Sequence, residues 1–241
     1  MRRANEIVAQ VLRKMRDWVV PGVTTAELDH RAEAVILAHN AVPSFKGYPP
    51  GGAHPFPATI TTSVNEELVH GIPGSRVLNE GDILSIDVGA ILDGYHGDGA
   101  VTLPVGEIDD ESQDLIAVTE GALEAGIGTA RAGNRSGDIS AAIQQYVEDR
   151  GYEVVREYTG HGIGRKMHEE PQVPNHGRPG QGILLREGMT IALEPMVLIS
   201  SPAVRVLDDH WTVVARNGKR TAHCERSIAI TEGEADILTR W

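Results

Sequence analysis

The chain has 241 residues, 41% of them hydrophobic and 23% charged, with a formal net charge of −12 at pH 7. This profile fits one large globular domain and excludes a disordered, fibrous or low-complexity chain. The acidic charge opposes nucleic-acid binding by the bulk surface. No apolar run is long enough to cross a bilayer, so we expect a cytoplasmic protein. A single cysteine excludes an internal disulfide or a cysteine-built zinc site, so any metal must be held by histidines and carboxylates.

Four segments have apolar residues at the three- and four-residue spacing of amphipathic helices. Pro21 and Gly22 end the first of them, Thr25 is the expected N-cap of the second, and Gly151 follows the last. The predicted helices are Arg2–Val19, Ala26–His39, Ser112–Ala130 and Ser136–Arg150.

Short segments rich in β-branched residues predict the strands of an antiparallel or mixed sheet. These segments are Ala58–Ser63, Ile83–Val88, Gly99–Val105, Thr190–Glu194, Trp211–Ala215 and Arg226–Thr231. The intervening segment Val42–Pro57 is dense in proline and glycine, which excludes a helix or a central strand there. We expect it to be an exposed or site-lining loop.

Motifs of the first half of the chain recur in the same order in the second half. Thr25 and Ser136 both stand at a helix start, and His70 and His161 both begin His-Gly-Ile. Asp87 and Glu194 both lie six residues after a glycine, and Asp98 and Glu225 both end a His-x-acid motif. The pattern predicts a duplicated helix–helix–strand unit, with halves of roughly 1–110 and 111–241 in one domain. The two halves would surround one sheet and bring their charged members together at the seam.

Acidic residues inside otherwise apolar strands are the most informative feature. Asp87 follows Ile-Leu-Ser-Ile, Glu194 follows Ile-Ala-Leu, and Glu225 precedes Arg-Ser-Ile-Ala-Ile. A buried, unpaired carboxylate costs several kcal/mol or more, so such residues need a cation beside them. One such acid alone is best read as an outward-facing residue on a half-exposed strand, but four acids at matched repeat positions favour a metal site.

The number of acids predicts how many ions are bound. Four carboxylates around one divalent ion would leave excess negative charge, whereas two ions about 3.5–4 Å apart can share bridging carboxylates. Oxygen ligands with one imidazole suit cobalt, manganese, iron or zinc. We therefore expect two divalent metal ions.

These residues and the motifs around them resemble the type I methionine aminopeptidases, which share the pita-bread fold with creatinase and prolidase. The motifs are Thr61-Thr-Ser-Val-Asn-Glu, His70-Gly-Ile-Pro, Asp87-Val-Gly, Gly94-Tyr-His-Gly-Asp98, Gly160-His161-Gly-Ile-Gly, His168-Glu-Glu-Pro, Leu193-Glu194-Pro-Met and Glu225-Arg-Ser-Ile. The resemblance covers nearly the whole chain. It implies an α+β pita-bread fold, with two pseudo-symmetric halves around a curved, mostly antiparallel sheet in a single catalytic domain.

The resemblance also implies a role for each metal-site residue. Asp87 would hold one ion, His161 and Glu194 the other, and Asp98 and Glu225 would bridge both. Glu194 would in addition carry the proton during catalysis.

Six residues would contact the substrate by the same resemblance. His70 and His168 would stabilise the tetrahedral intermediate without binding metal, and the pocket for the methionine side chain would be formed by Tyr48, Phe56, Thr61 and Trp211. Thr61 stands where many relatives carry a cysteine, so the side chain that borders the pocket at this position stays small.

The implied activity is removal of the N-terminal methionine from nascent proteins and peptides when the second residue is small, by attack of a metal-activated hydroxide on the first peptide bond. One alternative is a Xaa-Pro-directed peptidase of the same fold, which normally adds an N-terminal domain for which there is no room before Arg2. Another is a non-catalytic binding relative, which would have lost metal ligands that this chain retains.

The expected partners follow from that activity. Nascent polypeptide N-termini are the implied partner, contact with the ribosome through surface loops is left open, and no membrane association is implied. We expect a monomer.

Overall fold

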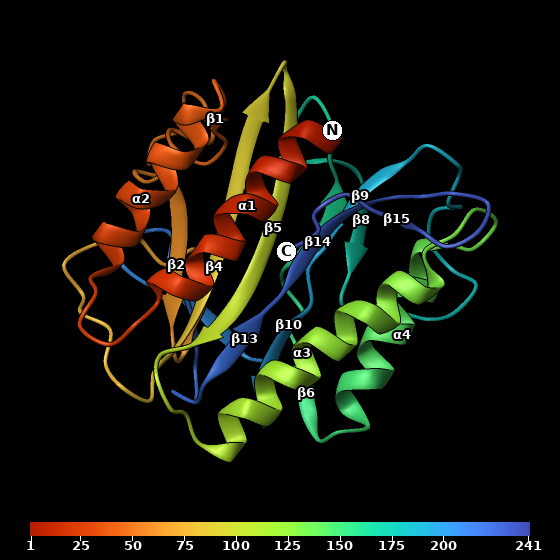
Figure 1. The fold of residues 1–241 in the computed structure, drawn as a ribbon. Helices are drawn as coiled ribbons and strands as arrows, with labels where there is room; N and C mark the ends of the chain where they lie inside the picture. The colour runs from red at the N-terminus through yellow and green to blue at the C-terminus, as the bar shows by residue number, and fades with distance from the viewer.

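Apolar residues at helical spacing form four long helices in the computed structural model, which describes residues 1–241 (Figure 1). The helices are α1 (Arg2–Trp18), α2 (Thr25–Ala38), α3 (Asp110–Thr129) and α4 (Ser136–Glu148). Each begins and ends within two residues of its predicted bounds. The predicted cap of α2 is wrong, because Thr24, not Thr25, accepts a hydrogen bond from the backbone N–H of Glu27, whose side chain bonds back to Thr24.

The strands form one large sheet and two small ones, and all the strand pairs are antiparallel. The large sheet follows the order β1-β4-β5-β14-β9-β7-β8, with β2 paired to β4 and β15 paired to β14. Its strands are β1 (Val42–Pro43), β2 (Ile60–Val64), β4 (Ile83–Leu92), β5 (Tyr95–Pro104), β7 (Thr159–Gly162), β8 (Glu169–Pro174), β9 (Thr190–Leu193), β14 (Glu225–Ala229) and β15 (Asp236–Ile237). The predicted α+β class with a mostly antiparallel sheet is confirmed.

The small sheets have the orders β13-β10-β6 and β11-β12-β3. Their strands are β3 (Glu67–Val69), β6 (Tyr152–Val154), β10 (Met196–Ile199), β11 (Val204–Val206), β12 (Val213–Ala215) and β13 (Thr221–His223). Each of the six predicted strands overlaps an observed one. The other nine strands were not predicted. Two of them form an edge of the large sheet: β7 was missed because it contains two glycines, and β8 because it contains two prolines, which an edge strand can accommodate.

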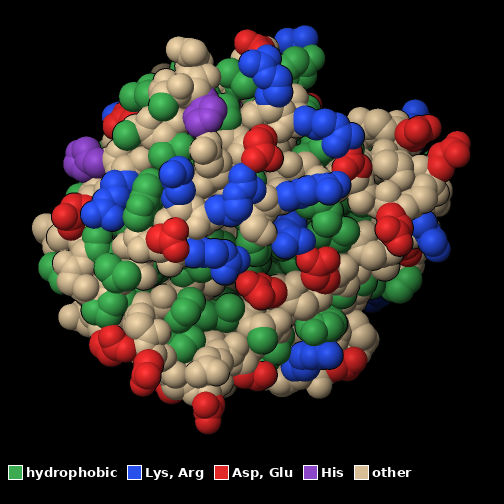
Figure 2. Space-filling model, viewed as in Figure 1, with side chains coloured by type: hydrophobic (Ala, Val, Ile, Leu, Met, Phe, Trp, Pro, Cys, Tyr) green, Lys and Arg blue, Asp and Glu red, His purple; other side chains and the backbone are tan.

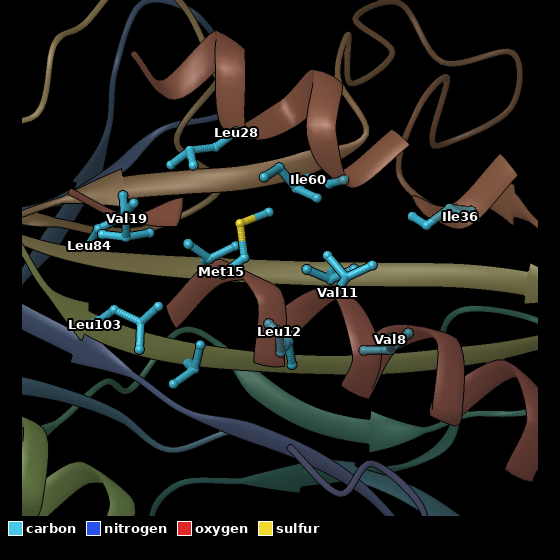
Figure 3. Close-up of a cluster of buried hydrophobic side chains, with 14 of the residues drawn as sticks. Val8, Val11, Leu12, Met15, Val19, Leu28, Ile36, Ile60, Leu84 and Leu103 are labelled. Atoms are coloured by element: carbon cyan, nitrogen blue, oxygen red, sulfur yellow. The ribbon is translucent and has the colours of Figure 1, made fainter. Parts of the chain in front are cut away.

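The first helix pair covers β2, β4 and β5. Apolar side chains from α1, α2 and these strands form one buried cluster (Figure 3). Its largest fully buried members are Leu12, Met15, Leu28, Ile36, Ile60, Leu78, Leu84 and Ile86. Burial of each such side chain stabilises the fold by roughly 1.5–3 kcal/mol, so this cluster fixes how α1 lies against the sheet.

The second helix pair, α3 and α4, packs in the same way against β9, β10 and β14. Figure 1 shows all four helices on one side of the large sheet. Acidic and basic side chains are interspersed over that outer, helix-covered surface (Figure 2). None of the helices has the length and hydrophobicity needed to span a membrane. The division into duplicated halves at about residue 110 stays a prediction.

Candidate active site

Three of the predicted ligands share one face of the sheet because of the strand register. Ala100 on β5 pairs with Asp87 on β4 and with Glu225 on β14, and directly paired residues project to the same face. Asp98 lies two residues before Ala100 and therefore also projects to that face. The alternate β4 residues Ile86 and Val88 belong to the helix-side cluster, so the acids face away from the helices.

The other two predicted ligands reach the same face from β7 and from the end of β9. His161 pairs with Ala192, and Glu194 follows two residues later. Two glycines flank His161: a Cβ on Gly160 would lie 2.6 Å from the Ala192 carbonyl oxygen, and one on Gly162 only 2.2 Å from the Glu170 carbonyl oxygen. Only glycine lets the neighbouring strands approach His161 this closely.

These side chains converge within a few ångströms. The Nε2 atom of His161 lies 3.6 Å from Glu194 Oε1 and 3.8 Å from Asp98 Oδ2. One possible ligand atom from each of Asp98, His161 and Glu225 falls within 4.8 Å of the others. The Nδ1 atom of His161 lies 2.9 Å from the carbonyl oxygen of Gly162, so Nδ1 carries the proton and the Nε2 lone pair faces the carboxylates.

The backbone of Asp98 is held by α1 and by the C-terminal segment. Its N–H donates to Asn5 Oδ1 at 3.2 Å, and its carbonyl accepts from Ser227 Oγ at 3.0 Å and from Thr239 Oγ1 at 2.8 Å. Asn5 is fully buried. Sequence reasoning missed this support, although an asparagine among the apolar residues of α1 was a usable signal.

The electrostatics of this cluster favour a bound cation. Without one, burial raises the pKa of Asp87 to about 7. Burial together with repulsion among the carboxylates raises the pKa values of Asp98, Glu194 and Glu225 well above their usual range. Burial lowers the pKa of His161 to about 4, which keeps its imidazole neutral and able to coordinate.

Buried polar atoms without hydrogen-bond partners also indicate a bound cation. The buried atoms Asp87 Oδ1, Glu225 Oε1 and His223 Nε2 have no hydrogen-bond partner. His223 Nε2 lies 3.9 Å from Glu194 Oε2, so this histidine stands beside the cluster. Buried oxygens without partners, next to one neutral imidazole, fit divalent cobalt, manganese, iron or zinc.

A cavity of about 160 Å³ opens beside these carboxylates. Because a water molecule fills about 30 Å³, this volume suits one amino-acid side chain. All eleven residues named from the sequence line it: Tyr48, Phe56, Thr61, His70, Asp87, Asp98, His161, His168, Glu194, Trp211 and Glu225. Phe45 and Met167 also line it, and no sequence motif pointed to them.

Aromatic rings form the apolar wall of the cavity. Phe56 is buried and meets Trp211 edge-to-face, with ring centroids 5.2 Å apart. The Trp211 indole N–H donates to the carbonyl oxygen of His54 at 3.0 Å, which ties it to the loop before Phe56. The predicted strand start at Trp211 is wrong, because Trp211 lies in the turn before β12. Its backbone N–H donates there to Asp209 Oδ1.

Two histidines that sequence analysis placed outside the ligand set, His70 and His168, line the same cavity. His168 is exposed, and its ring centroid lies 4.4 Å from that of His161. His70 has a left-handed backbone (φ 61°) and lies edge-to-face with Trp211 at 6.1 Å. Desolvation of the rings by the surrounding protein lowers the pKa of both, to about 4 for His70, so both rings are neutral near pH 7.

The metal-free protein should lose stability as the pH rises above 6.5. Carboxyls whose pKa is raised by folding contribute stability at low pH, and they lose it as the pH passes the folded-state value, which is about 7 for Asp87. Histidines with lowered pKa have the opposite sign, but their effect ends above pH 6.5. The expected loss is up to about 1.4 kcal/mol per pH unit for each carboxyl still titrating.

Thermal unfolding of the metal-stripped protein between pH 6.5 and 8.5 measures this loss, and added Mn²⁺ should abolish it. Asp114→Asn, which changes an exposed acid of α3, should show the same pH slope as the unchanged protein. A metal-stripped protein whose melting temperature stays constant or rises over this range would contradict the electrostatic origin of the effect.

Comparison with known proteins places this geometry in a family. The sequence profile of metallopeptidase family M24 matches residues 1–232. Methionine aminopeptidase 1 of Bacillus subtilis is 52% identical over 240 residues, which cover 100% of this chain and 95% of that protein. The crystal structure of a methionine aminopeptidase from Thermotoga maritima superposes with a TM-score of 0.96 at 45% identity, covering 100% of this chain and 95% of that one.

A Xaa-Pro dipeptidase from Bacillus anthracis is more distant. It superposes with a TM-score of 0.79 at 23% identity, and the match covers 100% of this chain but 59% of that one. This likeness shows a shared fold only.

Proposed function

Because this chain belongs to metallopeptidase family M24 and is a methionyl aminopeptidase with the pita-bread fold, we propose that it binds two divalent metal ions. We also propose that it releases the N-terminal methionine when the second residue of the substrate is small. The observation that carries the proposal is the cluster of four carboxylates and one imidazole on the helix-free face of the sheet, beside a cavity of side-chain size. Nascent protein N-termini are its substrates.

The donor set divides between two ions. Asp87 would hold the first ion, His161 and Glu194 the second, and Asp98 and Glu225 would bridge them. The orphaned oxygens of Asp87 and Glu225 and the free Nε2 lone pair of His161 support this division. Two ions also balance the four negative charges, which one divalent ion does not.

When bound, the ions supply a nucleophile that is active at neutral pH and polarise the scissile carbonyl. Glu194 would take the proton from the attacking water at a carboxylate oxygen and deliver it to the nitrogen of the leaving peptide. Its side chain is 13% exposed, so it is accessible from the cavity yet largely shielded from bulk solvent.

His70 and His168, which both line the cavity, would hold the reacting amide. Neutral near pH 7, each has one N–H that can donate to the substrate. A donor placed where negative charge develops stabilises the tetrahedral intermediate more than the substrate.

The cavity walls account for methionine specificity. Phe56 and Trp211 offer an apolar surface, and Met167 adds a flexible wall. Thr61 on β2 pairs directly with Asp87 on β4, and its small side chain leaves room in the cavity. An unbranched thioether fits a narrow apolar pocket of this volume. The carboxylates and metals attract the free α-amine of the substrate.

We expect rapid release of methionine when the second residue is Gly, Ala, Ser, Thr, Cys, Pro or Val, and slow release before Lys, Leu or Phe, because the cavity mouth restricts the second side chain. The kcat/KM for Met-Ala-Ser should exceed that for Met-Lys-Ser and for Leu-Ala-Ser by on the order of 10²-fold. N-acetylated Met-Ala-Ser should not be cleaved.

A Xaa-Pro peptide with a first residue other than methionine is the matched competitor substrate. A preference for that peptide over Met-Ala-Ser would show that the cavity selects proline at the second position and would refute the proposed specificity.

A further inference from the structure

A hydrogen bond joins the pocket residue Tyr48 to His168. The Tyr48 hydroxyl lies 2.6 Å from Nδ1 of His168, and the two rings are tilted at 51° with their centroids 5.3 Å apart. The Nε2 atom of His168 has no hydrogen-bond partner within the chain, while the ring itself lines the cavity. Tyr48 therefore occupies one nitrogen of the ring and leaves the other for a ligand.

The position of Tyr48 is fixed, although it lies in the loop rich in proline and glycine. Its N–H donates to the Phe45 carbonyl at 2.8 Å, and its carbonyl accepts from the N–H of Phe56 at 2.7 Å. The Gly47 N–H donates to the Phe56 carbonyl at 2.8 Å, and the Tyr48 ring packs against the small cluster that contains Met167. The hydroxyl is thus presented to His168 by a rigid framework.

The direction of this hydrogen bond decides which imidazole tautomer is present. Partial burial raises the pKa of Tyr48, so the phenol keeps its proton and can donate. If the hydroxyl donates, Nδ1 is the acceptor and the proton of the neutral ring sits on Nε2. In the reverse arrangement Nε2 would be a bare acceptor, which could not stabilise negative charge.

We propose that Tyr48 is a positioning residue for catalysis, whose hydroxyl donates to Nδ1 of His168 and so holds the ring with an Nε2–H directed at the substrate. This inference rests on the proposed role of His168 in the reaction. Tyr48 then has two functions, because its ring is part of the methionine pocket and its hydroxyl orients a catalytic donor.

The variant Tyr48→Phe separates the two functions, since it keeps the ring and removes only the hydroxyl. With Met-Ala-Ser as substrate, kcat should fall by about tenfold, as for loss of one hydrogen bond, while KM changes by less than about twofold. Tyr152→Phe is the matched control: it removes a hydroxyl that donates to Asp114 at 2.8 Å on the helix side, and it should keep the kcat of the unchanged protein.

Two further measurements exclude a merely structural effect. In the double variant Tyr48→Phe/His168→Ala, kcat should equal that of His168→Ala alone, because the hydroxyl acts only through the imidazole. Imidazole ¹⁵N shifts of the zinc-loaded protein should show the His168 proton on Nε2, with the signal assigned by its absence from His168→Ala.

The possible failures are distinguishable. An unchanged kcat in Tyr48→Phe, a further tenfold fall in the double variant, or a His168 proton on Nδ1 would overturn the positioning role while His168→Ala remains impaired. Full activity of His168→Ala itself would overturn both the proposed role of His168 and this inference.

Discussion

Replacing Asp98 with asparagine should lower metal content and methionine release together. The amide nearly keeps the shape of the side chain but removes a charge that two ions would share, and the residue is only 2% exposed, so water cannot take its place. Metal chemistry supplies several kcal/mol to such reactions, so we expect kcat/KM for Met-Ala-Ser to fall by at least about 10³-fold. Elemental analysis of the same preparation should show fewer than two ions per chain.

The control for this variant is Asp114→Asn, which makes the same change on the exposed surface of α3 and should keep full activity and metal content. Asp98 is also held by backbone hydrogen bonds that do not involve its carboxylate, so the variant should fold. Full turnover with full metal content in Asp98→Asn would refute a bridging role for this residue.

Replacing His168 with alanine should lower kcat/KM by on the order of 10²–10³ without loss of metal. The ring lies beside His161, and its exposure leaves it accessible to the substrate. Loss of a transition-state donor lowers kcat, whereas loss of a ligand lowers metal content, so the two roles are separable. Kinetics with Met-Ala-Ser and elemental analysis of one preparation provide the test.

His39→Ala is the matched control, because it removes an exposed imidazole at the C-cap of α2. Its activity and metal content should equal those of the unchanged protein. If His168→Ala instead bound one ion fewer, His168 would be a metal ligand and its assignment as a substrate contact would be wrong.

The strands β4, β5, β9 and β14, which position most of the metal site, were predictable because their signals are local. Asp87 and Glu225 stand out as acids in apolar strands, and the alternation of strand side chains directs them away from the helix-side core. The four helices were predictable from their apolar spacing to within two residues at each end.

What the sequence did not reveal depends on contacts between distant segments. Tyr48 and His168 lie 120 residues apart, and nothing local to either one indicates their hydrogen bond. Asn5 supports Asp98 across 93 residues, and Met167 lies in a loop without any motif of its own. The β7 strand was missed because its two glycines lower strand propensity, while close packing around His161 requires them.

The proline- and glycine-rich segment Val42–Pro57 shows the same division. Its composition predicted a loop, and only Val42–Pro43 at the sheet edge forms a strand. The family resemblance pointed to Tyr48 and Phe56 as pocket residues, whereas Phe45 reaches the cavity through tertiary packing that no motif indicated.

Metal stoichiometry of the unmodified protein is the most direct test of the paired site on the helix-free face. The protein would be stripped of metal, reloaded with Mn²⁺ or Co²⁺ during calorimetric titration, and assayed with Met-Ala-Ser at each step. We expect no activity before reloading, two ions bound per chain at saturation, and methionine release that rises with occupancy. Full activity in the stripped protein, or saturation at a single ion per chain, would contradict a site in which Asp98 and Glu225 bridge two metals.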